Sequence, residues 1–180
     1  MKILTAVRTA AEWHVDQRRK GAAGEPYLNH LVEVADLVAS AGAPEDVICA
    51  AVLHDAIEDQ DVTAEMIAAR FGADVAALVL EVTDDRSLSK AERKARQIAV
   101  APHLSPGAQL IRLADKISNV RSIASSPPLG WPPARLAEYV EFCCRVVAGL
   151  RSIDPVLAKT FDDEVRTTVA ALAPIARIAT

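Results

Sequence analysis

The sequence has few aromatic residues, no long hydrophobic run and no excess of positive charge. Phe, Trp and Tyr make up only 4% of the 180 residues, although hydrophobic residues make up 51%. This composition, rich in alanine and poor in β-branched and aromatic clusters, favours helices over sheet. The net charge of −4 argues against generic adhesion to nucleic acid or to an anionic membrane. No stretch approaches the roughly 18 apolar residues that a membrane-spanning helix needs.

Cysteine is also scarce, and its spacing excludes two common uses. Cys49, Cys143 and Cys144 fit neither a zinc knuckle nor a disulfide framework. We interpret them as core residues of a protein in a reducing compartment. The apolar run before Arg8 is too short for a signal peptide. A cytoplasmic location is therefore predicted.

The apolar residues recur with the period of an α-helix. One such series follows the i, i+3/i+4 pattern: Leu110, Leu113, Ala114, Ile117 and Val120. Three helix starts carry caps: Thr63, Ser89 with Glu92 in a capping box, and Ser105 before Pro106. Gly72 is typical of a helix end. No segment alternates with period two, and no linker or repeat is present. The sequence predicts an all-α, single-domain bundle over residues 1–180, with roughly eight to ten helices.

The segment AAVLHDAIEDQD (50–61) places five ionisable residues, His54, Asp55, Glu58, Asp59 and Asp61, after an apolar run. On a helix predicted through 45–59, His54 and Glu58 are i, i+4 neighbours, and so are Asp55 and Asp59. Burying an unpaired charge costs several kcal/mol, so such groups are paired, solvated or bound to a metal. A lone His-Asp pair is most often a solvated helix end. Here the apolar residues before His54 favour a position at the edge of the core.

Two further segments of the same character support a metal site. EPYLNHLVEVADLVA places His30 near the start of an apolar helix, and LIRLADKISNVRSI places Asp115 among apolar neighbours. Taken singly, His30 is more often a core histidine and Asp115 a surface carboxylate. Together, His30, His54, Asp55 and Asp115 form a mixed nitrogen and oxygen ligand set that suits Mn²⁺, Fe²⁺ or Zn²⁺. We predict that these four side chains meet around one cation.

The order of these residues matches a known pattern. H…HD…D is the signature of the HD phosphohydrolase superfamily, and further motifs follow in sequence: GEPYLNH, VLHDAIED, FGADVAALVLEVTDD, KAERK, SPGAQLIRLADKISNV and GWPPARLAEYVEF. From about residue 8 to 153 the chain resembles the hydrolase domain of RelA/SpoT proteins. In length and detail it is most similar to the stand-alone small alarmone hydrolases of the metazoan SpoT-homologue type. No segment resembles their synthetase or regulatory domains.

The resemblance implies hydrolysis of the 3′-pyrophosphate of guanosine tetra- or pentaphosphate, (p)ppGpp, with Mn²⁺ as the cofactor and a small nucleotide as the substrate, and it leaves the oligomeric state open. It makes His30, His54, Asp55 and Asp115 the metal ligands. It makes Glu58 and Asp59 the acidic pair that assists catalysis. We assign proton transfer to Glu58 and positioning of the water molecule to Asp59, a division that could be reversed. It lines the nucleotide pocket with Arg19, Lys20, Lys90, Asn119, Arg135 and Tyr139.

Other basic and aromatic residues have plainer interpretations. A solvated position is at least as plausible as a pocket position for Arg93, Lys94 and Arg112, and Trp131 is interpreted as a loop anchor. Ser118 stands in KISN where relatives carry KLHN or KLYN, and we expect it to remove a ring from beside the pocket. That expectation leaves base specificity open.

Two alternatives to an alarmone hydrolase follow from the same residues. The site could act on another nucleotide, for example the 2′-phosphate of NADPH. The protein could also be a non-catalytic alarmone-binding module, although all the matched ligands and both acids are intact. A purely structural helical adaptor leaves the four metal-type residues unexplained and ranks last.

Overall fold

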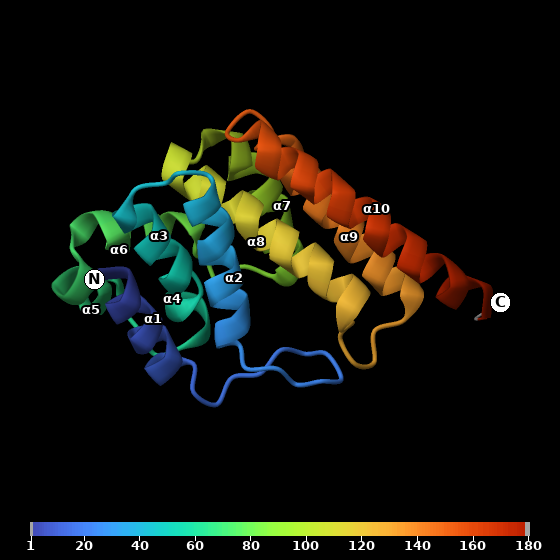
Figure 1. Ribbon diagram of the computed structural model, residues 1–180, viewed down its shortest axis with the longest axis horizontal. Helices are drawn as coiled ribbons and strands as arrows, with labels where there is room; N and C mark the ends of the chain where they lie inside the picture. The colour runs from blue at the N-terminus through green and yellow to red at the C-terminus, as the bar shows by residue number, and fades with distance from the viewer. Residues whose placement is uncertain (1, 179–180) are drawn as a thin grey trace.

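The computed structural model describes residues 2–178, with the side chains described as far as residue 173, and within this range the regular elements are helices joined by loops (Figure 1). The helices are α1 Lys2–Trp13, α2 Leu28–Ser40, α3 Glu45–Leu53, α4 Ala56–Asp59, α5 Ala64–Phe71, α6 Ala73–Val82, α7 Lys90–Val100, the 3₁₀ helix η1 Ala101–His103, α8 Pro106–Ser125, α9 Pro133–Ala148 and α10 Pro155–Ile178. Those residues contain ten α-helices and no named strand, which confirms the predicted all-α class.

The predicted caps determine several helix ends. The Thr63 side chain accepts a hydrogen bond from the Met66 amide at the start of α5, and Ser105 accepts one from Ala108 at the start of α8. Ser89 and Glu92 form both hydrogen bonds of a capping box on α7. Gly72 lies between α5 and α6 with φ +96°, a backbone conformation that residues with a Cβ rarely adopt. These boundaries agree with the sequence predictions.

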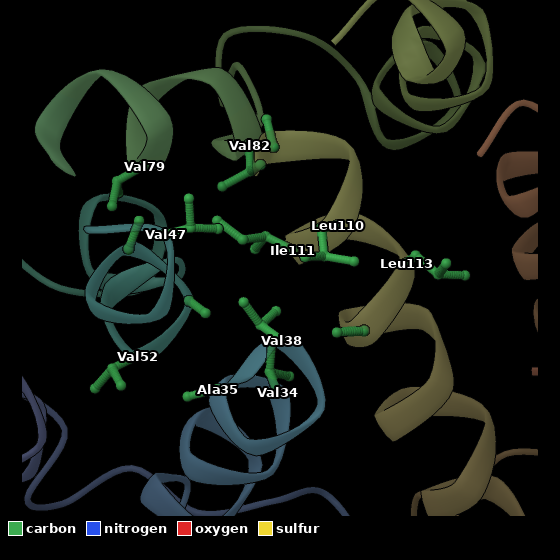
Figure 2. Packing of buried hydrophobic residues seen from close by; sticks show 14 of the residues in the cluster. Val34, Ala35, Val38, Val47, Val52, Val79, Val82, Leu110, Ile111 and Leu113 are labelled. Atoms are coloured by element: carbon green, nitrogen blue, oxygen red, sulfur yellow. The ribbon is translucent and has the colours of Figure 1, made fainter. Parts of the chain in front are cut away.

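The main core lies where α2, α3, α6 and α8 face one another (Figure 2). Its buried side chains are mostly valine, alanine and leucine, including Val34, Ala35 and Val38 of α2, Val47 and Val52 of α3, Val79 and Val82 of α6, and Leu110, Ile111 and Leu113 of α8. Small and medium side chains of this kind allow the helices to pack closely with only three aromatic residues, Phe71, Phe142 and Phe161, in the cluster. The scarcity of aromatics therefore does not prevent a continuous core.

Helix α8 connects the two parts of the fold. One side of it contacts α2, α3 and α6, and the other side contacts α9 and α10, which run beside it (Figure 1). Phe161 of α10 is fully buried in the main core, and a smaller cluster of Ile123, Leu136 and Val140 joins α8 to α9. Side chains on α8 are thus held from both sides.

Two loops far apart in the sequence are joined at one end of the molecule. The loop before α2 and the loop between α8 and α9 lie close together below the helices in Figure 1. The Leu129 amide donates a hydrogen bond of 2.9 Å to the Lys20 carbonyl, and Gly21 forms a bridge with Pro128. A Cβ on Gly21 would lie 2.0 Å from the Ser126 hydroxyl oxygen, so this close approach requires glycine.

The predicted continuous helix over 45–59 is wrong in one respect. Helix α3 ends at Leu53, and α4 begins at Ala56, so His54 and Asp55 occupy a turn between them. The His54 Nδ1 atom lies 2.8 Å from the Ala51 carbonyl oxygen, the acceptor that a continuous helix would pair with the Asp55 amide. We attribute the break to this side-chain bond.

Within the described residues, no helix combines the length and the apolar character needed to cross a membrane.

Candidate metal centre and its cavity

Three segments bring the four predicted ligands together. His30 comes from the first turn of α2, His54 and Asp55 come from the turn after α3, and Asp115 comes from the middle of α8. The His30 Nε2 atom lies 3.7 Å from Asp55 Oδ2 and 3.5 Å from Asp115 Oδ1. The His54 Nε2 atom lies 3.2 Å from Asp55 Oδ2 and 3.9 Å from Asp115 Oδ1. The structure therefore brings the two imidazoles and two carboxylates into one cluster.

The arrangement fits a divalent cation. The two histidines and Asp115 each offer a ligand atom within 4.8 Å of the others, and all three residues are buried. The His54 Nε2 atom is buried without a hydrogen-bond partner in the described part of the chain. Because the Ala51 carbonyl can only accept, His54 Nδ1 carries the proton and donates it. Nε2 is then the ring atom that a metal can bind, and the mixed nitrogen and oxygen set suits Mn²⁺, Fe²⁺ or Zn²⁺.

Electrostatics keep the two carboxylates ionised. Burial acts to raise the pKa of Asp55, but the neighbouring His54 and His30 side chains outweigh burial and hold the pKa well below its usual range. Burial likewise opposes ionisation of Asp115, whereas the Lys116 ammonium, 2.9 Å from Asp115 Oδ2, lowers the pKa. The Tyr27 hydroxyl donates to Asp55 Oδ2 at 2.6 Å and adds support from the residue preceding α2.

Burial and the neighbouring carboxylates give the two histidines different pKa values. It lowers the pKa of His30 below the ordinary value, which favours the neutral imidazole that a metal ligand requires. For His54, burial acts in the same direction, but attraction from Asp55 and Asp115 prevails and raises the pKa to about 9. A bound cation therefore competes with a proton at His54.

Glu58 and Asp59 occupy different environments on the short helix α4. Burial, followed by the nearby Asp55 and Asp84 carboxylates, raises the pKa of Glu58 to about 7. Asp59 accepts hydrogen bonds from the Gln17 amide at 2.7 Å and from Arg86 at 3.3 Å. Glu58 can thus gain and lose a proton near neutral pH, whereas Asp59 is held by fixed donors.

A cavity of about 440 Å³ opens beside this cluster, a size that accommodates a small organic ligand. Its acidic lining residues include Asp55, Glu58, Asp59, Asp84 and Asp115. Its basic lining residues are Arg18, Arg19, Lys20, Lys90, Arg93, Lys94, Arg112 and Lys116. The basic residues come from the loop before α2, from α7 and from α8, so they approach the cavity from several elements.

Part of this positive charge lacks a carboxylate partner. Burial, followed by repulsion from Arg135, Lys94 and Lys20, lowers the pKa of Lys90. No carboxylate of residues 2–173 lies within salt-bridge distance of Lys90 or Lys94. The Lys94 ammonium instead lies 4.7 Å from the centre of the Phe142 ring. Uncompensated cations at the edge of a cavity favour an anionic ligand.

Five of the six predicted nucleotide-binding residues line the cavity: Arg19, Lys20, Lys90, Asn119 and Tyr139. The Arg19 guanidinium donates to Asn119 at 3.2 Å and to Ser122 at 2.7 Å. Arg135 is the exception, because it is exposed and lies 4.1 Å over the Trp131 ring rather than on the cavity wall.

The structure decides several interpretations that the sequence left open, and it differs from the expectation for Ser118. Arg93, Lys94 and Arg112 line the cavity, and Arg112 is 8% exposed with its guanidinium bonded to the Val82 carbonyl. Trp131 lines the cavity as well as anchoring its loop. Ser118 does not stand beside the cavity; it is buried behind His30, 2.8 Å from Nδ1.

Sequence reasoning also missed Tyr27, Asp84 and Gln17. Tyr27 and Asp84 belong to the quoted segments GEPYLNH and VTDD, and Tyr27 precedes His30 by three residues, a spacing that places both on one side of a helical turn. No local pattern marks Gln17, because its partner Asp59 is distant in the chain.

Comparison with known proteins agrees with this geometry. A model of the HD domain family matches residues 6–140, and the helical fold and the histidine–aspartate cluster are those of that class. The chain belongs to the HD domain family.

The relatives define a narrower group. The guanosine-3′,5′-bis(diphosphate) 3′-pyrophosphohydrolase MESH1 of Mus musculus is 45% identical over 152 residues, which are 83% of this chain and 85% of the relative. MESH1 of Danio rerio is 47% identical over 151 residues, 83% and 84% of the two chains. A solved structure of a metazoan ortholog of SpoT that hydrolyzes ppGpp matches with a TM-score of 0.88 and 40% identity, covering 92% of this chain and 94% of that one. Within the HD domain family, the chain therefore belongs with the MESH1 proteins.

Proposed function

We propose that this protein is a metal-dependent (p)ppGpp 3′-pyrophosphohydrolase, which releases pyrophosphate and leaves GDP or GTP. The observation that carries the proposal is the juxtaposition, in one cavity, of the histidine–aspartate cluster with basic side chains that lack carboxylate partners. A substrate with several phosphates supplies the negative charge that these basic side chains attract. MESH1 relatives named for this activity support the same choice.

His30, His54, Asp55 and Asp115 would hold the cation, for which we propose Mn²⁺. The bound cation would supply positive charge for the phosphoryl oxygens and make a water molecule easier to deprotonate. Glu58, with its pKa raised to about 7, accepts that proton, and Asp59 orients the water. Gln17 and Arg86 hold Asp59 in place for this role.

The remaining cavity residues bind and orient the nucleotide. Lys90 and Lys20 supply positive charge for the phosphates, and Arg19 is held by Asn119 and Ser122 against one wall. Tyr139 and Trp131 provide ring faces on which a base can stack. Arg135 supports this wall through the Trp131 ring.

We further propose that residues 1–180 form one domain in the cytoplasm. Buried residues from Ala6 to Phe161 share a single hydrophobic cluster, which supports one folding unit. All three cysteines are free, which suits a reducing compartment.

Turnover of ppGpp with and without Mn²⁺, with the products identified, tests the function directly. NADPH and simple nucleotides are assayed beside it. We expect GDP and pyrophosphate to form only with the metal. Negligible ppGpp cleavage beside robust turnover of NADPH would move the assignment to that substrate, and nucleotide binding without pyrophosphate release would indicate a binding module.

Two variants separate metal binding from proton transfer. His54→Ala is expected to lose both metal and activity, because it removes a ligand. Glu58→Gln is expected to keep the metal and lose turnover, because glutamine cannot accept the proton. Glu138→Gln on α9, an exposed position outside the cavity lining, is the matched control. Full activity in Glu58→Gln would remove Glu58 from the mechanism.

A further inference from the structure

A chain of polar side chains leads from His30 toward the outer helices. The His30 Nδ1 atom lies 2.8 Å from the Ser118 hydroxyl on α8, and that hydroxyl donates to Glu33 Oε2 on α2. The other Glu33 oxygen accepts a hydrogen bond from Arg121. Arg121 also pairs with Glu164 of α10 at 2.8 Å. This series of hydrogen-bonded side chains therefore connects α2, α8 and α10 behind the proposed metal centre.

The number of available protons fixes the direction of these bonds. An ionised Glu33 can only accept, and a serine hydroxyl has a single proton to donate. Because that proton goes to Glu33, the Ser118 oxygen is left to accept from His30. His30 must then carry its ring proton on Nδ1. Its Nε2 lone pair points to the side where Asp55 and Asp115 lie.

We propose that Ser118 and Glu33 are positioning residues that hold His30 in the Nδ1-protonated tautomer and in the ring orientation that presents Nε2 to a cation. Arg121 holds the Glu33 carboxylate in place, and it links this function to α10 through Glu164. The expected effect of these residues on metal affinity rests on the proposed metal-dependent function. Their expected effect on the His30 tautomer does not depend on that function.

The physical basis is the support that metal-bound histidines need. A histidine ligand almost always donates its other ring proton to a carboxylate, carbonyl or water, and loss of such a partner typically lowers metal affinity or activity about 10- to 100-fold. His54 donates to the Ala51 backbone carbonyl, which mutation cannot remove. His30 depends on a side chain, so its support can be tested by substitution.

Ser118→Ala removes the acceptor for His30 and the donor to Glu33 with little change in volume, since the side chain is small and 1% exposed. Ser125→Ala, on the same helix but exposed and bonded only to the Arg121 carbonyl, is the matched control. Imidazole ¹⁵N NMR of the metal-free proteins reports the His30 tautomer. Chelator competition with Mn²⁺ reports metal affinity. Circular dichroism establishes that each variant is folded.

We expect the wild-type protein and Ser125→Ala to show the Nδ1-protonated tautomer at His30. Ser118→Ala is expected to show a mixture of tautomers and about 10- to 100-fold weaker Mn²⁺ binding. An unchanged tautomer together with Mn²⁺ affinity within about twofold of wild type would overturn the proposal, because it would leave His30 independent of Ser118.

Glu33→Gln provides a second test that does not alter the buried serine. Its amide can donate to Ser118, which frees the serine proton for His30 Nδ1 and favours the opposite tautomer. We expect the ¹⁵N spectrum to show protonated Nε2 and Mn²⁺ binding to weaken. Retention of the wild-type tautomer would exclude Glu33 from the positioning role.

If wild-type protein shows the expected tautomer but binds no Mn²⁺, the proposed function fails while the His30–Ser118–Glu33 arrangement stands.

Discussion

Replacement of Glu58 by glutamine should stabilise the metal-free protein at alkaline pH while removing its activity. Burial and two neighbouring carboxylates raise the pKa of Glu58 from 4.5 in the unfolded chain to about 7 in the folded protein. Between these values the folded state binds more protons than the unfolded state, so the free energy of unfolding falls as the pH rises. The loss begins near the unfolded pKa and is complete above the folded one.

The magnitude follows from the size of the shift. A difference of about 2.5 pKa units corresponds to about 3.4 kcal/mol at pH 8. Because the Glu58 side chain is only partly buried, solvent screening reduces this figure, and we expect about 2 kcal/mol. At pH 5 the difference in the free energy of unfolding between the two proteins is less than about 1 kcal/mol. Glutamine keeps a carbonyl that can accept from the Asp84 amide, as the Glu58 carboxylate does.

Urea unfolding of wild type and Glu58→Gln between pH 5 and pH 8, in the presence of EDTA, measures this effect. The difference between the two proteins removes the contributions of other titrating groups. Glu138→Gln serves again as the control and should follow the wild-type curve. Parallel stability curves for wild type and Glu58→Gln across the whole range would refute the argument, since they would mean that Glu58 ionises as readily in the folded protein as in the unfolded chain.

Three further substitutions test the fold and the cavity. Phe161→Ala leaves a void in the main core and should cost about 3–5 kcal/mol in urea unfolding; a cost under about 1 kcal/mol would contradict the burial of α10. Gly21→Ala places a Cβ 2.0 Å from the Ser126 hydroxyl oxygen and should separate the two loops, raising the KM for ppGpp with little change in thermal stability. Lys90→Ala should raise KM and weaken its dependence on salt, because one cation facing the phosphates is lost. A KM unchanged by Lys90→Ala at low salt would place the phosphates elsewhere.

The sequence predicted the helical class because helical periodicity is a local pattern, and it predicted the meeting of His30, His54, Asp55 and Asp115 because the order of the H…HD…D motifs matches that of a known family. The break at His54 was not predictable, since it depends on a side chain bonding its own backbone. The burial of Arg112 was missed because charged residues are mostly exposed, and only the packed fold shows the carbonyl that it reaches.

Ser118 illustrates a different limit. Its position in the KISN motif gave its place on α8, but not the direction of its side chain, which depends on how α8 turns against α2. The motif comparison suggested a missing ring beside the nucleotide. The structure instead places the hydroxyl behind a metal-type histidine, in a bond with Glu33. A sequence motif shows where a residue lies along a helix, but the direction of its side chain depends on how that helix packs.

The backbone hydrogen bond between Lys20 and Leu129 constrains how the rim of the cavity can change. Inserting or deleting a residue in either loop would shift the register of the bond and displace Lys20 or Trp131 from its wall. Variation in length at one loop therefore requires a matching change at the other. Altering substrate choice through this rim calls for redesign of both segments as a pair.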